Sequence, residues 1–397
     1  MQVGKEYIFI TDIGTPKVKY FKGKLLSVAL KYVYTIFTEG KTVVFTRDDN
    51  ILHCEDESEI VYPHDKKKQM ELRDHPHKFE MILLHCIKTK NKPLTDFILH
   101  HCDLSFVYQG GTALEIAMEH YVAFMVQLLI QKRAAFSQPI FLKKAIHTYP
   151  YPLQIYNVSR ITDMSYLFRD YEFTDDDISQ WDVSNVTDMR GLFMNSNFQG
   201  DISGWNVSNV KDMSGMFFQT DFDGDLSQWN VSKVTDMVAM FRNTNFQGDI
   251  SRWNISNVIH MHQLFMNSLF DGDISTWDVS RVENMSEMFR ISSFQGDLSS
   301  WKVSRVKDMN HMFYDSLFDN DLSQWDVSNV RDMRKMFAHS SFQQDISSWN
   351  VTGNTNCMFE ECPIPEYFKP SRLPVLQCKQ VGAGSRRTRR KFFQLLR

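Results

Sequence analysis

The sequence predicts an α+β repeat protein, most of which is a solenoid of strand-plus-short-helix repeats. All eight tryptophans stand 24 residues apart, from Trp181 to Trp349, without an insertion or deletion. A stack of identical units requires such a period because each unit presents the same side chains to its neighbours. Within each repeat, a short apolar alternation predicts a strand, and an apolar stripe at three- to four-residue spacing predicts a helix.

The repeat around Trp205 shows the pattern on which both predicted elements depend. The alternation of Ile202, Trp205 and Val207 is typical of a short strand. Asn209 is a good helix N-cap, and Asp212 then faces the positive end of the helix dipole. The inward-facing stripe of the predicted helix consists of Val210, Met213, Met216 and Phe217.

One aspartate in each repeat is expected to form a column along the stack. Strands about 4.8 Å apart would align these carboxylates. A calcium site is one interpretation of the column. We favour a turn, because the Asp and Ser of a D-x-S motif can each bond nearby backbone N–H groups. The column consists of Asp177, Asp201, Asp225, Asp249, Asp273, Asp297, Asp321 and Asp345.

The repeat also carries a family resemblance. The motif W-[DN]-V-S-N-V-x-D-M-x-x-[M/L]-F, seen from Trp181 to Phe193, resembles the BspA-like leucine-rich repeats over residues 156–360. The resemblance implies a right-handed solenoid used in adhesion or protein–protein contact. Bacterial members are largely secreted or lipid-anchored. The opening residues 1–6 show neither a signal peptide nor a lipobox, so we expect an intracellular protein.

Two smaller segments precede the solenoid, which we place at residues 151–365. Residues 1–66 contain five β-branched or aromatic runs and a hairpin turn at Glu39-Gly40-Lys41, which predict a small SH3-like β module. Residues 67–150 have helical periodicity. The predicted strands cover residues 7–10, 18–21, 25–28, 33–37 and 43–45.

The helical segment resembles ankyrin repeats. The run from Gly110 to Ala117, followed by residues 124–130, is similar to the two helices of one ankyrin unit, with Glu115 where histidine is usual. Residues 94–99 resemble the outer helix of the preceding unit, and residues 140–147 the inner helix of the next. Ankyrin stacks bind proteins, so the resemblance implies a protein partner.

Charge and cysteine content restrict the function classes. The net charge of −4 is too small to indicate a nucleic-acid or membrane partner for the whole chain, and no apolar run is long enough to cross a membrane. The His-Cys pairs at 53–54, 85–86 and 101–102 fit no zinc spacing. We therefore expect no metal and no cofactor.

The tail from residue 366 onward is basic. It is an alternative site for nucleic acid, nuclear localisation or an anionic surface, and the opposing interpretation is a solvated tail. Its basic cluster consists of Arg386, Arg387, Arg389, Arg390 and Lys391.

No phosphate-binding loop, nucleophile elbow or dinucleotide fingerprint is found, so we expect no enzyme. His260 and His262 depart from the repeat and are interpreted as drift.

Solenoids vary on the surface that they use. The variable position just after the recurring Phe of each predicted helix is rich in aromatic, Met and Arg residues, the types enriched at interfaces. The candidates there are Met194, Phe218, Arg242, Met266, Arg290 and Tyr314, with Ala338 at the end.

The sequence thus favours a protein-interaction scaffold. The combination of repeat types resembles uncharacterised proteins of protists and of the large DNA viruses that infect them, which implies a host or virion protein as partner. A surface adhesin is the first alternative, and a nucleic-acid adaptor that uses the β module and the tail is the second.

Overall fold

The computed structural model describes residues 110–371 without a gap, residue 373, scattered residues between 83 and 108, and the backbone of six strands between residues 6 and 61. The chain divides into two compact domains. We call Met1–Ile161 the N-terminal domain and Thr162–Arg397 the solenoid domain, and each is described by itself.

The first strands form one antiparallel sheet with the order β4-β3-β2-β1-β5-β6. The predicted runs 18–21 and 25–28 belong to a single strand, β2, whose register shifts between Leu25 and Ser27. Thr38 pairs with Lys41, as the predicted hairpin requires. The SH3-like barrel remains a prediction. The strands are β1 (Glu6–Thr11), β2 (Lys19–Val28), β3 (Tyr34–Thr38), β4 (Lys41–Phe45), β5 (Ile51–Cys54) and β6 (Ile60–Val61).

A two-stranded hairpin and three helices follow. The predicted helix pair is found as α4 and α5, and the third predicted helix as α6, whereas most of residues 94–99 lies outside the described residues. The ankyrin assignment remains a prediction. The elements are β7 (Val107–Tyr108), β8 (Gly111–Thr112), α4 (Ala113–Glu119), α5 (Ala123–Gln131), α6 (Pro139–Thr148) and the 3₁₀ turn η1 (Leu153–Ile155).

Glu115 connects the starts of two helices. With Thr112 it forms a capping box at the first turn of α4. Its fully buried carboxylate also accepts hydrogen bonds from the backbone N–H groups of Ser137 and Gln138, at 2.7 and 2.6 Å, just before α6. Burying a carboxylate is costly unless donors surround it, and here they do. Glu115, which stands where ankyrin repeats usually have histidine, therefore fixes α6 to α4.

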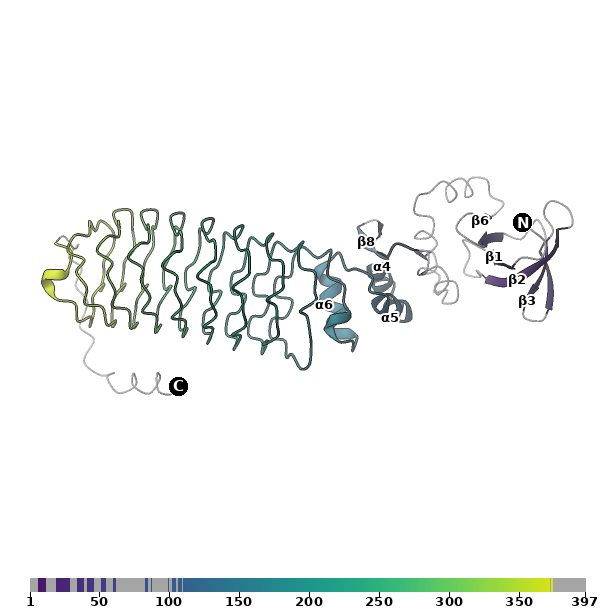
Figure 1. Cartoon of the computed structure of the whole chain (residues 1–397), viewed down its shortest axis with the longest axis horizontal. Coiled ribbons are helices and arrows are strands. Elements are labelled where there is room, and N and C mark those ends of the chain that lie inside the picture. Colours follow the sequence, from purple (N-terminus) through teal and green to yellow (C-terminus); the bar gives the residue numbers. More distant parts are fainter. Residues whose placement is uncertain are drawn as a thin grey trace. The chain divides into compact units, whose positions relative to one another are not determined.

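The solenoid domain is a stack of 24-residue repeats (Figure 1). The prediction of a strand and a short helix in each repeat is wrong. Described residues 156–365 form successive tight turns and isolated parallel bridges, and the next regular element is the 3₁₀ turn η2 (Glu366–Phe368). The right-handed sense implied by the resemblance remains a prediction.

The residues predicted to be helical form a ladder between repeats instead. The repeat of Trp181 is the second of the stack, because a repeat without tryptophan precedes it. In this second repeat, the N–H groups of Met189, Gly191 and Phe193 bond to carbonyls of the next repeat at 2.8–3.0 Å. The intervening N–H groups of Leu192 and Met194 bond three residues back. The turns need a positive φ at two positions per repeat, occupied in the second repeat by Gly191 and Asn195. Neighbouring repeats thus satisfy the polar backbone that an α-helix would satisfy internally.

The apolar stripe is buried as predicted, although it lies on turns. Val210, Met213 and Phe217 are fully buried, as are their equivalents in the other complete repeats. Phe193 stacks on Phe217 at 5.8 Å between ring centroids, and this stacking continues from repeat to repeat. A spacing of three residues suits consecutive turns as well as a helix, so the pattern identified the core correctly and the backbone wrongly.

Candidate interaction surface

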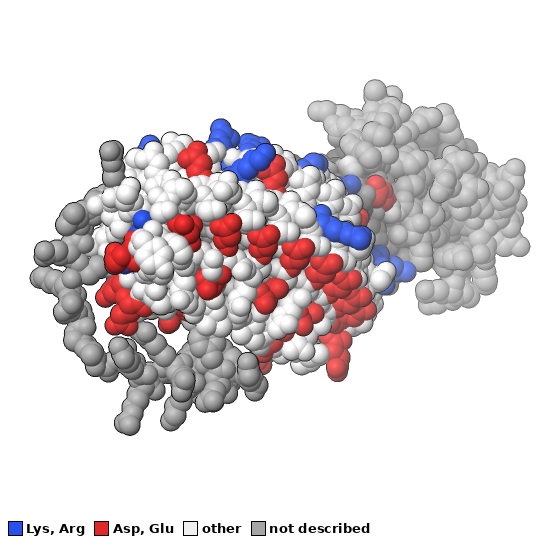
Figure 2. All heavy atoms as spheres, turned by 60° about the vertical axis from the view of Figure 1, so that its left-hand side comes forward, with Lys and Arg blue, Asp and Glu red and all other residues white. Residues whose placement is uncertain are grey.

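The D-x-S motif forms a turn in each of the eight repeats that contain a tryptophan, as the preferred interpretation predicts. Asp225 Oδ1 accepts a hydrogen bond from the Ser227 N–H at 2.8 Å, and the other seven aspartates make the same bond at 2.8–2.9 Å. These bonds lower the pKa of Asp225 because they stabilise the ionised form. Acidic side chains accordingly lie in rows along the stack (Figure 2).

No metal site emerges from this column. Among the residues that the structure describes, no three His, Cys, Asp or Glu side chains are grouped in a way that could hold a metal ion. The described helices also include none that is long and apolar enough to cross a membrane.

A second surface follows the turns that carry the ladder. We call it the ladder face and define it by four positions in each repeat, which in the second repeat are residues 190, 191, 194 and 195. The third of these positions is the variable position singled out in the sequence. The residues next to them in the chain, Met189, Leu192 and Phe193, are buried in the core. The ladder face therefore lies directly over the core.

The predicted partner-binding residues all fall on the ladder face but differ in exposure. Met266 is 9% exposed and Ala338 is fully buried, so these two belong largely to the core. The half-buried members are Met194, Phe218, Arg242, Arg290 and Tyr314.

Four of the half-buried members, Phe218, Arg242, Arg290 and Tyr314, are connected through a network between repeats. The guanidinium of Arg242 lies 5.2 Å from the centroid of the Phe218 ring and donates to Gln263 Oε1 at 2.8 Å. Gln263 in turn donates to Glu287 Oε1 at 3.2 Å, and Glu287 Oε2 pairs with Arg290 at 2.6 Å. These side chains therefore also pack on neighbouring repeats, although they remain partly open to solvent.

The network continues toward the C-terminal end of the stack. The Arg290 guanidinium lies 5.2 Å from the centroid of the Tyr314 ring, and that ring meets His339 edge-on at 5.2 Å. His339 Nδ1 lies 3.1 Å from Glu361 Oε2. One side of the stack is therefore covered by side chains whose contacts cross the repeat boundaries.

Two histidines of the ladder face were not recognised as part of a surface from the sequence. Burial lowers the pKa of His262, and the neighbouring His260 lowers it further. Burial also lowers the pKa of His311, and the Arg290 charge adds to the effect. His262 occupies a ladder-face position and is not drift on an exposed helix. Comparing residues that stand 24 positions apart would have shown that His262 belongs to this surface.

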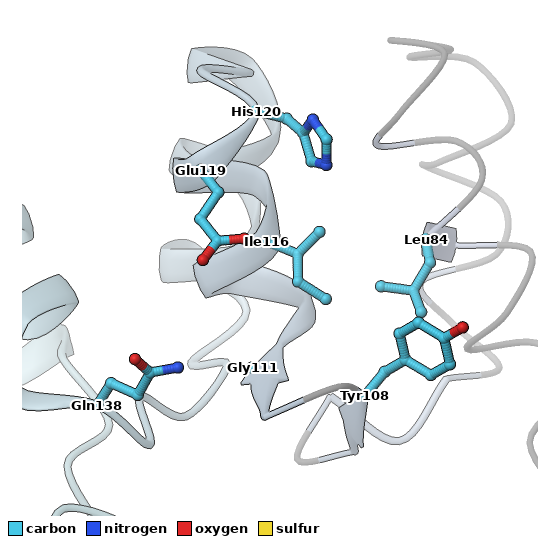
Figure 3. Close-up of a pocket in the computed structure, with 7 residues that line it drawn as sticks. All are labelled: Leu84, Tyr108, Gly111, Ile116, Glu119, His120 and Gln138. Carbon is cyan, nitrogen blue, oxygen red and sulfur yellow. The ribbon is translucent and has the colours of Figure 1, made fainter.

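A small cleft of about 140 Å³ lies in the N-terminal domain. Tyr108 and Leu84 face Ile116 and His120 across the opening, and Glu119 lies beside them (Figure 3). The cleft is lined mainly by the hairpin β7–β8 and by α4.

The predicted tail site remains a prediction, because its basic cluster lies outside the described residues. The cluster consists of Arg386, Arg387, Arg389, Arg390 and Lys391.

The solenoid matches a known repeat family. The model of the family described as "Mycoplasma protein of unknown function, DUF285" matches three overlapping segments, residues 137–245, 218–317 and 290–366. The chain belongs to this family. The DUF285 match covers more than half of the chain and agrees with the BspA-like resemblance of the repeats. No curated protein and no solved structure matched this DUF285 chain.

Proposed function

We propose that the protein is a non-enzymatic scaffold that binds another protein through the ladder face. The observation that carries the proposal is the contrast between invariant and variable positions. The core positions keep Trp, Val, Met and Phe, and the D-x-S turn, which we call the D-x-S corner, is also kept. The ladder face instead changes from Met194 to Phe218 to Arg242 in successive repeats. A surface that only had to cover the core would not need aromatic and Arg residues, which interfaces favour.

Membership of a repeat family is compatible with this role, because solenoids use extended surfaces for contacts with other proteins. The BspA-like and ankyrin-like resemblances imply the same class of function. The resemblance to proteins of protist-infecting DNA viruses supports a host or virion protein as the partner.

The test is affinity purification from lysate of the source cells, or of their host, with the full chain as bait. The variant Phe218→Ala with Tyr314→Ala removes the two rings that the arginines cover, and we expect it to reduce capture of the partner about tenfold or more. The matched control is Gln228→Ala with Gln324→Ala, which changes two exposed residues in the D-x-S corner. Equal capture by native protein and double variant would contradict the proposal, provided that both melt within a few degrees of each other.

The basic tail supports nucleic-acid binding as a second candidate function. Nine Lys or Arg residues and no acidic residue follow Glu366. We expect deletion of residues 383–397 to lower any salt-dependent binding of nucleic acid. Unchanged binding in low salt would exclude the tail as the site.

A further inference from the structure

The middle of the ladder face carries a single formal charge. Across three consecutive repeats its twelve positions hold one charged residue, Arg242, if histidine is counted as neutral. His262 belongs to this patch, and its lowered pKa favours the neutral ring. We call these positions the neutral patch. It consists of Ser214, Gly215, Phe218, Gln219, Val238, Ala239, Arg242, Asn243, His262, Gln263, Met266 and Asn267.

The Arg242 side chain is held in place but is not neutralised. Nη1 donates to Gln263, the guanidinium lies over Phe218, and Nε is buried without a hydrogen-bond partner. Among the described residues, no carboxylate pairs with Arg242. The guanidinium therefore has a fixed position without an internal carboxylate beside it among the described residues.

Arg290, two repeats later, has the carboxylate partner that Arg242 lacks. It also lies 5.2 Å from an aromatic centroid, but it pairs with Glu287 of its own repeat at 2.6 Å. The position that corresponds to Glu287 in the repeat of Arg242 is Ala239. One arginine thus has an internal carboxylate, and the other has a methyl group in its place.

We propose that the neutral patch binds an acidic segment of the protein partner, with a carboxylate of that segment on Arg242 and an apolar side chain beside Phe218. This inference rests on the proposed function and specifies the chemistry of the partner. An arginine stacked on a ring and already restrained binds a carboxylate with little further loss of side-chain entropy. None of the ladder-face positions in these three repeats holds a carboxylate, so no anion of the patch itself competes for Arg242.

The decisive variant supplies the missing carboxylate. Ala239→Glu would place an acidic side chain three residues before Arg242, as Glu287 is placed before Arg290. Ala239 has φ 53° and Glu287 has φ 56°, so the backbone accepts glutamate at this position. The matched control is Ala239→Gln, because Gln263 occupies the same column at φ 59° without a charge.

The probe is a phage-displayed library of random dodecapeptides, selected on the full native chain. We expect enrichment of peptides with Asp or Glu near an apolar residue. In fluorescence anisotropy, Ala239→Glu and Arg242→Gln should each raise the Kd of the synthetic peptides at least tenfold. Ala239→Gln should change this Kd less than threefold. Replacement of the peptide's acidic residue by its amide should weaken binding in the same way.

Three results would overturn the inference: no enrichment, enriched peptides without an acidic residue, or peptides that bind Ala239→Glu as tightly as the native chain. The same variants in the lysate purification separate the two claims. A partner that is lost with Phe218→Ala and Tyr314→Ala but kept by Ala239→Glu would overturn this inference and leave the proposed function intact. A partner kept by both variants would overturn both.

Discussion

The indole Nε1 of Trp205 donates a hydrogen bond to the carbonyl of Ile178 in the preceding repeat, at 3.1 Å. The next six tryptophans make the same bond at 2.9–3.2 Å. Phenylalanine would fill only part of this space and has no donor. The period of 24 residues is therefore kept by tryptophan because each indole both fills the core and joins two repeats.

Trp325→Phe should destabilise the solenoid domain by about 2 kcal/mol. The change removes a buried hydrogen bond to Leu298 and leaves space beside the ring. Urea unfolding followed by circular dichroism measures the effect. Gln324→Ala, at the exposed neighbouring position, is the control and should change stability by less than about 0.5 kcal/mol. Equal effects of the two changes would show that the indole N–H is not a tie between repeats.

Glu115→Gln should loosen the helices of the N-terminal domain. The carboxylate of Glu115 accepts four hydrogen bonds, including two from Ser137, and an amide NH₂ cannot accept. We expect a loss of about 2–3 kcal/mol and faster amide exchange at the start of α6. Glu119→Gln changes an exposed glutamate of the same helix and serves as the control. Unchanged exchange in Glu115→Gln would refute the role of this carboxylate.

Gln247→Asp should destabilise the stack in a salt-dependent way. Asp and Gln alternate strictly at this position in successive repeats, and the Asp223 carboxylate accepts the Gln247 N–H at 2.8 Å. The change would place three carboxylates in consecutive repeats. We expect a cost of about 0.5 kcal/mol at low salt that largely disappears at about 1 M salt. Gln247→Asn is the neutral control. A cost independent of salt would exclude repulsion as the cause.

Acid should weaken the stack through the D-x-S column. The Ser N–H bonds lower the pKa of seven of the aspartates, so the folded state binds protons more weakly than the unfolded state. Their contribution is complete above the unfolded pKa of about 3.9 and is lost as the pH falls through the folded-state values. Asp225→Asn with Asp249→Asn should reduce the fall in melting temperature below about pH 4. An identical fall would contradict this. The seven are Asp177, Asp201, Asp225, Asp249, Asp273, Asp297 and Asp345.

The histidines of the ladder face should act at higher pH. The pKa values of His262 and His311 are lowered by burial, so the unfolded state binds a proton first as the pH falls below about 6.5. Stability should therefore decline as the pH falls below about 6.5, and this decline should end once the pH has passed the lowered folded-state pKa values of the two histidines. His262→Gln with His311→Gln should remove this first decline in thermal melts. A decline that persists in the double variant would place its origin elsewhere.

The sequence predicted the core far better than the backbone. Burial of Trp205, Val210 and Phe217 follows from apolar character at a fixed period, and this holds whatever the backbone does. The choice between helix and turns depended on left-handed residues at two positions per repeat. Residues such as Ile291 and His311 occupy those positions, and side chains of this kind give no signal for positive φ. Bonds between repeats compensate for the cost of that conformation.

The candidate surface could be predicted only in part. The column that contains Phe218 and Arg242 was found because it varies at 24-residue spacing. The sequence pattern did not reveal that Gln263 and Glu287 belong to the same network as this column. Their own column lies beside it because the backbone at these positions is left-handed. In the helix that the sequence predicted, residues three apart would be neighbours only within one repeat. The network between repeats therefore had no counterpart in the sequence pattern.

The central claim is that the ladder face binds the partner, and site-specific photo-crosslinking tests it most directly. A benzoylphenylalanine would replace Gln219 on the ladder face in one full-length chain, and Gln228 in the D-x-S corner in another; both positions are exposed. After irradiation in lysate, we expect a covalent adduct with a partner protein from position 219 and none from position 228. Adducts from position 228 alone, or equally from both positions, would contradict the claim.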